Sequence, residues 1–299
     1  MEHQLSNPFA VQTPESINAE DALALFVDVF TDFHKVLKPG HTFLHGPRGS
    51  GKSMMFRYML PDCQRLEIRR KTGNRLLKHL EYFCAYIPIK LTDVHLTELD
   101  RLVDKHADII LNEHWISIFI TIKLFGSLNR LLSDEEEIMD KKEIKEFYTS
   151  VFCKLIGDAG WELSTDDLEF DSEAKMYFRQ MLNICENISN NFSQYTRRLW
   201  LTSEPQNYNG PICSYLDFLF PLLQNIKNLS FMPKGPIFIL IDDADNLNET
   251  QKTILNTWVS YRTTSEVSIK ASTQLNYENW RTVSGQTIDS PHDYSEVNI

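Results

Sequence analysis

A glycine-rich segment that ends in lysine and serine is the part of this sequence best suited to chemistry. Residues 46–53 read Gly-Pro-Arg-Gly-Ser-Gly-Lys-Ser, which matches the pattern G-x-x-x-x-G-K-[ST] at every fixed position. Glycines let the backbone curl so that its N–H groups point inward and meet the negative charges of a phosphate chain. In such a loop Lys52 reaches the β- and γ-phosphates, and the Ser53 hydroxyl coordinates Mg²⁺.

The surroundings of this loop favour a functional turn over an ordinary glycine-rich one. The segment 41–45 has strand character, and residues 53–60 form a helical pattern that stops at Pro61. A strand, the loop and a helix in that order are the context that the motif requires. We expect the nucleotide to contact the following residues: Gly46, Pro47, Arg48, Gly49, Ser50, Gly51, Lys52, Ser53 and Met54.

A second candidate element is an apolar run that ends in acids. Residues 237–241 read Ile-Phe-Ile-Leu-Ile and lead into Asp242, Asp243 and Asp245. The lack of alternation predicts a strand covered on both faces, as in a parallel sheet. We expect Asp242 to hold Mg²⁺ through water and Asp243 to orient or deprotonate the attacking water. The alternative for both is a structural role, such as capping the next helix, and we expect Asp245 to be a cap or a supporting residue.

The elements that must position these residues alternate between strands and helices. Strands are predicted at 41–45, 82–91, 237–241 and 266–271, and helices at 18–37, 53–60, 99–132, 133–156, 172–199, 213–229 and 249–261. This alternation predicts an α/β layered fold. Because 190 residues separate Lys52 from Asp242, and two βα units need only about 60, a large helical insertion lies between them. We predict core segments at 1–92 and 233–299 and the insertion at 93–232, which either recognises a partner or buttresses the sheet.

Composition limits the class of protein. Of 299 residues, 42% are hydrophobic and 24% are charged, as in soluble globular domains. The formal net charge of −11 disfavours nucleic acid as a partner, although the basic stretch 65–79 could contact phosphates if it is not simply a solvated helix face. The apolar run 115–125 is too short for a membrane span. Five scattered cysteines without metal-site spacing indicate free thiols and a cytoplasmic protein.

Together these motifs resemble the AAA+ superfamily, and within it bacterial ATPases similar to origin-recognition-complex proteins and the neighbouring STAND NTPases. The resemblance also rests on Asn7-Pro-Phe9 and on the segment 268–274. It implies a P-loop fold with a parallel sheet flanked by helices, binding ATP and Mg²⁺. It also implies that Asn7 and Phe9 lie near the adenine and that Ser272 or Thr273 senses the γ-phosphate.

The resemblance suggests further roles outside the loop. Arg262 is a candidate arginine finger acting on a neighbouring subunit, and Arg281 is a weaker one; a solvated helix-end arginine is the alternative. AAA+ proteins follow this core with a helical lid, and none is visible before Ile299. Either the chain is a fragment, or the insertion or another chain does the work of the lid. We expect a homo-oligomer, or a partner protein bound through the insertion.

The leading functional hypothesis is an ATPase that works as a nucleotide-driven switch or motor module. An ATP-binding scaffold with little turnover and a DNA-loading ATPase of the origin-recognition type are the alternatives. A role in mobile elements or antiviral defence is implied by the resemblance alone.

Overall fold

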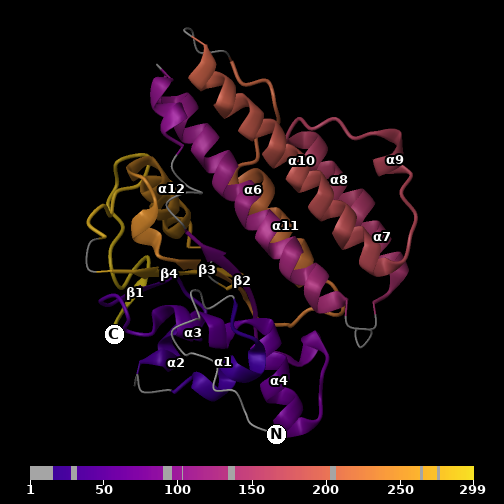
Figure 1. Cartoon of the computed structure of the whole chain (residues 1–299), viewed down its shortest axis with the longest axis vertical. Coiled ribbons are helices and arrows are strands. Elements are labelled where there is room, and N and C mark those ends of the chain that lie inside the picture. Colours follow the sequence, from indigo (N-terminus) through magenta and orange to yellow (C-terminus); the bar gives the residue numbers. More distant parts are fainter. Residues whose placement is uncertain are drawn as a thin grey trace, which may run out of the picture.

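The computed structural model (Figure 1) describes residues 16–27, 32–89, 96–102, 104–133, 139–202, 207–262, 265–274 and 277–299. Asn7 and Phe9 lie outside these ranges, so their expected position near the adenine stays a prediction.

The centre of the molecule is a parallel sheet. Its five strands are β1 (Thr42–His45), β2 (Phe83–Pro88), β3 (Ile237–Asp242), β4 (Val267–Thr273) and β5 (Ser295–Asn298), in the order β2-β3-β4-β1-β5. All four pairings are parallel, so the carboxyl ends of the strands meet at one edge. The predicted α/β fold is confirmed. Strand β5 was not predicted, because its Ser-Glu-Val-Asn sequence contains a single apolar residue, Val297.

One face of the sheet is covered by the helices around the glycine-rich loop. These are α1 (Ala19–Leu25), α2 (Phe33–Val36), α3 (Lys52–Met59) and α4 (Pro61–Thr72), followed by the 3₁₀ turn η2 (Leu77–His79). Met55, Phe56 and Met59 of α3 pack with Leu240 of β3 in one buried cluster. The glycine-rich loop is thus fixed directly to the core of the sheet.

The predicted single helix over 18–37 is wrong. Asn18 does cap α1, accepting a hydrogen bond from the Asp21 N–H at 2.8 Å, but the helix ends at Leu25 and Phe26 has an extended backbone. The ring of Phe26 stacks on Tyr58 of α3 at 4.1 Å between centroids. This tertiary contact takes precedence over the helical periodicity of the local sequence.

The opposite face carries the remaining helices. In chain order they are the 3₁₀ turn η3 (Thr97–Arg101), α6 (Lys105–Leu132), α7 (Lys141–Glu146), the π-helical turn η4 (Phe147–Phe152), α8 (Cys153–Asp158), α9 (Thr165–Leu168), α10 (Ala174–Leu201), the π-helical turn η5 (Tyr215–Leu219), α11 (Phe220–Lys227), the 3₁₀ turn η6 (Ala244–Asn246) and α12 (Glu249–Ser260). The long helices α6 and α10 lie side by side (Figure 1).

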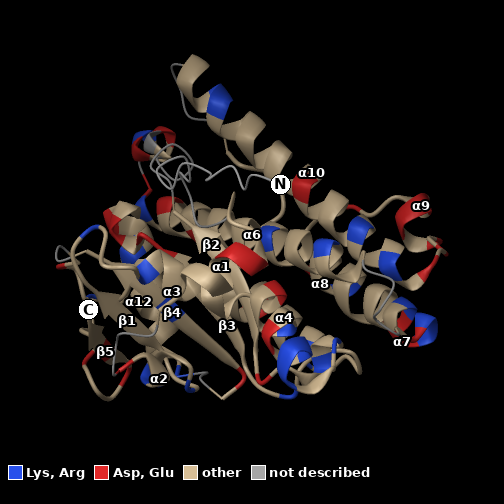
Figure 2. Ribbon diagram, turned by 60° about the horizontal axis from the view of Figure 1, so that its bottom comes forward, with Lys and Arg blue, Asp and Glu red and all other residues tan. Residues whose placement is uncertain are grey.

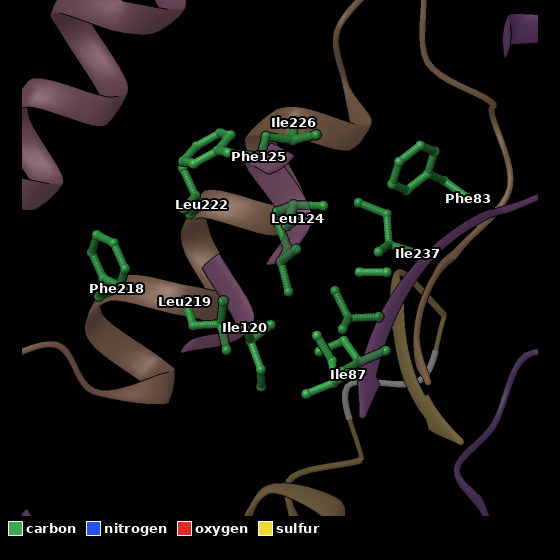
Figure 3. Packing of buried hydrophobic residues seen from close by; sticks show 14 of the residues in the cluster. Phe83, Ile87, Ile120, Leu124, Phe125, Phe218, Leu219, Leu222, Ile226 and Ile237 are labelled. Atoms are coloured by element: carbon green, nitrogen blue, oxygen red, sulfur yellow. The ribbon is translucent and has the colours of Figure 1, made fainter. Parts of the chain in front are cut away.

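The inserted helices share their core with the sheet. Ile120 and Leu124 of α6 and Leu222 of α11 lie opposite Ile87 of β2 and Ile237 of β3 (Figure 3). All five are at most 2% exposed, and they belong to one continuous cluster. The insertion therefore buttresses the sheet, whichever further role it has.

Helix α6 is the one helix of the described residues that is long and apolar enough to cross a membrane by length and composition. In the fold it packs on α10, α12 and β2, as the central helix of a globular core does.

Candidate functional site

The glycine-rich loop connects β1 to α3 and depends on glycine at three positions. Gly49 and Gly51 have φ values of 87° and 96°, in the left-handed region where other residues are strained. A Cβ on Gly46 would lie 2.8 Å from Ser50 Oγ and 3.0 Å from the Ile299 carbonyl oxygen. Glycine therefore permits the curled shape of the loop without strain at these points.

A cavity of about 460 Å³ opens beside the loop. The loop side of its lining consists of Arg48, Gly49, Gly51, Lys52, Ser53 and Met54. The other side consists of Asp243, Asn246 and Gln274, which follow β3 and β4. The fold thus brings Lys52 and Asp243 to one cavity although they are far apart in the sequence.

Lys52 is folded back onto its own loop. Its ammonium group donates to the carbonyl oxygens of Gly46 at 2.7 Å and Pro47 at 3.0 Å, and only 6% of the residue is exposed. Burial lowers the pKa of Lys52, and the nearby Asp243 carboxylate opposes that shift. The cation is therefore held at the cavity by neutral carbonyls, which a phosphate could replace as acceptor.

Asp242 is fixed by hydroxyl groups from both neighbouring strands. The Tyr86 hydroxyl of β2 donates to Oδ2 at 2.6 Å, and the Ser272 hydroxyl of β4 donates to Oδ1. Asp242 is 4% exposed. Two neutral donors therefore set the orientation of this carboxylate.

Asp243 follows directly and turns toward the cavity. Its backbone is left-handed, with φ at 55°, and its N–H donates to Ser272 Oγ at 3.0 Å. Burial, followed by the charge of Asp242, raises the pKa of Asp243, whereas Lys52 and Arg48 lower it. A carboxylate of raised basicity that faces a polar cavity suits a general base.

Ser272 or Thr273, at the end of β4, was expected to sense the γ-phosphate, but both side chains have partners inside the protein. Ser272 bridges Asp242 and the Asp243 N–H, whereas the Thr273 hydroxyl lies 2.6 Å from His45 Nδ1 and is fully buried. It is the next residue, Gln274, that lines the cavity. Gln274 was missed, although it is the last residue of the segment 268–274 on which the resemblance rests.

Two further residues of the site, Tyr86 and Asn246, belong to no sequence motif that could have identified them. Tyr86 reads as one apolar residue in the strand β2, and its contact with Asp242 exists only because β2 pairs with β3. Asn246, which lines the cavity, donates to the Ile89 carbonyl at 2.8 Å. This bond joins the cavity to the chain that leaves β2 toward the inserted helices.

Arg262 does not reach this cavity. It precedes β4 and therefore lies at the amino edge of the sheet, opposite the loop. Its Nε donates to Asp293 Oδ1 at 2.9 Å. Arg281 pairs with Thr287 in an isolated bridge and does not line the cavity either. A role in a neighbouring subunit stays a prediction for both arginines.

The oxygen atoms at this cavity suit magnesium. Ser53 offers a hydroxyl and Asp243 a carboxylate in the cavity lining, and the buried carboxylate of Asp242 precedes Asp243 directly. These are the hard ligands that Mg²⁺ prefers together with water and phosphate. The adjacent curled loop supplies inward N–H groups for the phosphates of the same ligand. The residues present therefore fit Mg²⁺ bound together with a nucleotide.

Comparison with known proteins gives remote structural matches. Structures of the plasmid coupling protein TrwB match in complex with ADP and Mg²⁺ (13% identity, TM-score 0.23, 80% of this chain and 64% of that chain) and with the non-hydrolysable ATP analogue ADPNP (14%, 0.21, 80% and 65%). An unbound form of the bacterial conjugative coupling protein, TrwBdeltaN70, matches at 10% identity with a TM-score of 0.22, over 86% of this chain and 69% of that chain.

The chain spans less than two thirds of the length of the first of these structures, and likeness this remote says nothing about the ligands of this chain. A search of curated proteins found no match. The family model described as ORC-CDC6-like, in contrast, matches residues 7–299. The chain therefore belongs to the ORC-CDC6-like family, and its predicted resemblance to origin-recognition-type AAA+ P-loop ATPases is confirmed.

Proposed function

We propose that this chain binds ATP with Mg²⁺ in the cavity beside the loop and hydrolyses it, acting as a nucleotide-driven switch or motor module. The observation that carries this proposal is the composition of the cavity. Lys52 and Ser53 lie on one side, and Asp243, Asn246 and Gln274 lie on the other. A phosphate chain between them would meet a cation, backbone N–H groups and a polarising carboxylate.

Each residue has a role in this proposal. The loop N–H groups and Lys52 bind the phosphates, and Ser53 with Asp242 holds the metal. Bound Mg²⁺ would neutralise charge on the phosphate oxygens. Asp243 orients the attacking water and accepts its proton, while Gln274 contacts the γ-phosphate or that water. Positioning and electrostatic stabilisation account for the catalysis, without a covalent intermediate.

The contacts around Asp242 and Asn246 support a switch. Tyr86 connects the Asp242 carboxylate to β2, and Asn246 connects the cavity to the Ile89 carbonyl at the end of that strand. Both contacts lie where the chain leaves the sheet for the inserted helices. A change at the γ-phosphate would therefore affect the start of the insertion. We propose the insertion as the surface for a partner protein or a second copy of the chain.

A specific observation favours the scaffold as a second candidate. Arg48 is the one arginine that lines the cavity among the described residues, and Arg262 lies at the opposite edge of the sheet. An arginine supplied by a neighbour commonly contributes a factor of about 10³–10⁵ in phosphoryl transfer. Turnover by the isolated chain would therefore be slow. The setting in antiviral defence, the cytoplasmic location and a role on DNA stay predictions.

The test compares Lys52→Ala and Asp243→Asn with the wild type. Lys52→Ala should abolish binding of a fluorescent ATP analogue, since no other ammonium lines the cavity among the described residues. Asp243→Asn should keep binding and lower phosphate release by about 10²–10⁴-fold. Lys154→Ala, which removes an exposed lysine of α8, is the matched control and should change neither.

The outcomes separate the candidates. Unchanged nucleotide affinity in Lys52→Ala would sink the nucleotide site, and wild-type turnover in Asp243→Asn would place the base elsewhere. Phosphate release that rises more steeply than protein concentration indicates shared sites between subunits. Binding without release at any concentration supports the scaffold.

A further inference from the structure

A second polar cleft lies between α4 and the carboxyl-terminal half of α6 and shares no lining residue with the cavity beside the glycine-rich loop. It consists of two adjoining cavities of about 330 Å³ and 220 Å³ that share Asp62 and Leu131. We name it the basic cleft, because six basic side chains line it: Arg57, Arg65, Arg69, Arg75, Lys123 and Arg130. Asp62 is the one acid in the lining of the two cavities.

The basic cleft brings like charges together from two separate helices. Lys123, Ser127 and Arg130 follow each other at spacings of four and three, which places them on one face of α6. Arg65 and Arg69 have the same relation on α4, where basic residues gather (Figure 2). Acidic residues outnumber basic residues by 41 to 30 in the whole chain, so the overall composition does not account for this concentration of positive charge.

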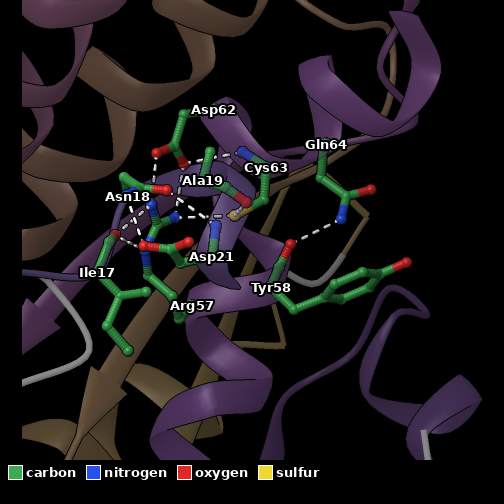
Figure 4. Close-up of polar contacts among 9 residues, drawn as sticks. All are labelled: Ile17, Asn18, Ala19, Asp21, Arg57, Tyr58, Asp62, Cys63 and Gln64. Carbon is green, nitrogen blue, oxygen red and sulfur yellow. Dashed lines mark hydrogen bonds and ion pairs between the residues drawn. The ribbon is translucent and has the colours of Figure 1, made fainter. Parts of the chain in front are cut away.

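The shared acid is already engaged. Both Asp62 oxygens accept from the Arg57 guanidinium, at 2.8 and 2.7 Å (Figure 4). Arg57 is 3% exposed, and it also donates to the Ile17 carbonyl. Asp62 therefore offsets the charge of Arg57.

Arg65 connects the two helices that form the basic cleft. It is 8% exposed and donates to the Arg75 carbonyl at 2.8 Å and to the Leu131 carbonyl at 3.2 Å. The second bond joins α4 to the end of α6. Arg69, Lys123 and Arg130 form no ion pair within the described part of the chain. An anion between the helices would stabilise this arrangement.

We propose that the basic cleft binds a small phosphorylated molecule whose phosphate oxygens accept hydrogen bonds from Lys123, Arg130 and Arg69. The planar guanidinium offers paired donors that match phosphate geometry. A small ligand contacts the basic cleft alone, whereas a long nucleic acid would also meet the repulsion of a molecule with net charge −11. This site is separate from the proposed ATP site, and Tyr86, which lines the basic cleft and donates to Asp242, lies between the two.

The test measures pyrophosphate binding by calorimetry in the Lys52→Ala background, which disables the glycine-rich loop. The double substitution Lys123→Gln/Arg130→Gln should weaken binding at least about tenfold, because it removes two charged donors. The control, Lys154→Gln/Arg197→Gln, removes the same charge from exposed positions on α8 and α10 and should leave the affinity unchanged.

A second variant keeps the test independent of folding defects. Ser127→Glu introduces a carboxylate between Lys123 and Arg130, three or four residues from each, and so replaces the anion. It should raise the thermal midpoint in phosphate-free buffer and abolish the rise that pyrophosphate causes in its parent.

Three results would overturn the proposal. The first is absence of pyrophosphate binding in the Lys52→Ala background, and the second is equal weakening of pyrophosphate binding by the basic-cleft and control double substitutions. The third is a basic-cleft double substitution that lowers the affinity for duplex DNA but not for pyrophosphate. ATP binding by the wild type is measured separately, so a failure here leaves the proposed ATP site untouched, and the reverse also holds.

Discussion

At the residue scale, two neutral hydroxyl groups determine how Asp242 faces the loop. Tyr86 and Ser272 each donate to one carboxylate oxygen, and both come from strands adjacent to β3. A carboxylate oriented before the metal arrives loses less freedom on binding it. The acid strand was recognisable from its sequence, but its two donors belong to segments with no motif of their own.

Tyr86→Phe tests this orientation. Loss of the hydroxyl removes a single hydrogen bond, so the Mg²⁺ concentration that supports half-maximal nucleotide binding should rise by roughly 3–10-fold. Tyr82→Phe, directly before the same strand, is the control, because the Tyr82 hydroxyl is buried without a partner among the described residues. An identical Mg²⁺ dependence for Tyr86→Phe and the wild type would exclude a positioning role for Tyr86.

At the scale of elements, two buried histidines connect strands and helices through neutral rings. His41 Nδ1, beside β1, accepts the Ile269 N–H of β4 at 3.0 Å, and His114 Nδ1 of α6 accepts the Cys213 N–H at 3.0 Å. Burial lowers the pKa of each histidine to about 4. Protonation at Nδ1 would break the bond and place a charge in the core.

The free energy of unfolding should therefore fall as the pH falls from about 6.5 to 4. In this range the histidines of the unfolded chain are protonated, whereas the buried histidines of the native protein are not. Their contribution to the free energy of unfolding is therefore fully present above pH 6.5 and decreases below it. The loss is on the order of 3 kcal/mol for each histidine at pH 4.

Urea unfolding at a series of pH values measures this slope. His114→Gln should flatten it between pH 6.5 and 5, whereas His106→Gln, at an exposed position, should not. A wild-type profile that is flat over this range would contradict the assignment of both histidines as buried and neutral.

At the scale of the whole molecule, the inserted helices and the sheet share one hydrophobic core and should unfold together. Leu222 of α11 is fully buried in the cluster that contains Ile87 and Ile237 (Figure 3). Leu222→Ala should cost about 2–5 kcal/mol and shift the unfolding of the entire chain.

Circular dichroism and tryptophan fluorescence should then report a single coincident transition for the wild type and the variant. Leu168→Ala, at a position that is 56% exposed, is the control and should change stability by less than about 0.5 kcal/mol. Two separate transitions, with only one displaced by Leu222→Ala, would show that residues 93–232 fold as an independent domain.

The sequence by itself determined the glycine-rich loop, the acidic strand and the α/β class. Each depends on local patterns: glycines that permit a curled backbone, an apolar run that must be buried, and alternating strands and helices. The family assignment over residues 7–299 agrees with these patterns.

Only the tertiary structure decided which side chains meet. Strand order brings Tyr86 to Asp242, the end of β4 turns Gln274 rather than Thr273 toward the cavity, and packing on Tyr58 ends α1 at Leu25. The basic cleft likewise exists because α4 and α6, distant in the chain, pack together. Such contacts depend on pairing between remote segments, which leaves no periodic trace in the local sequence.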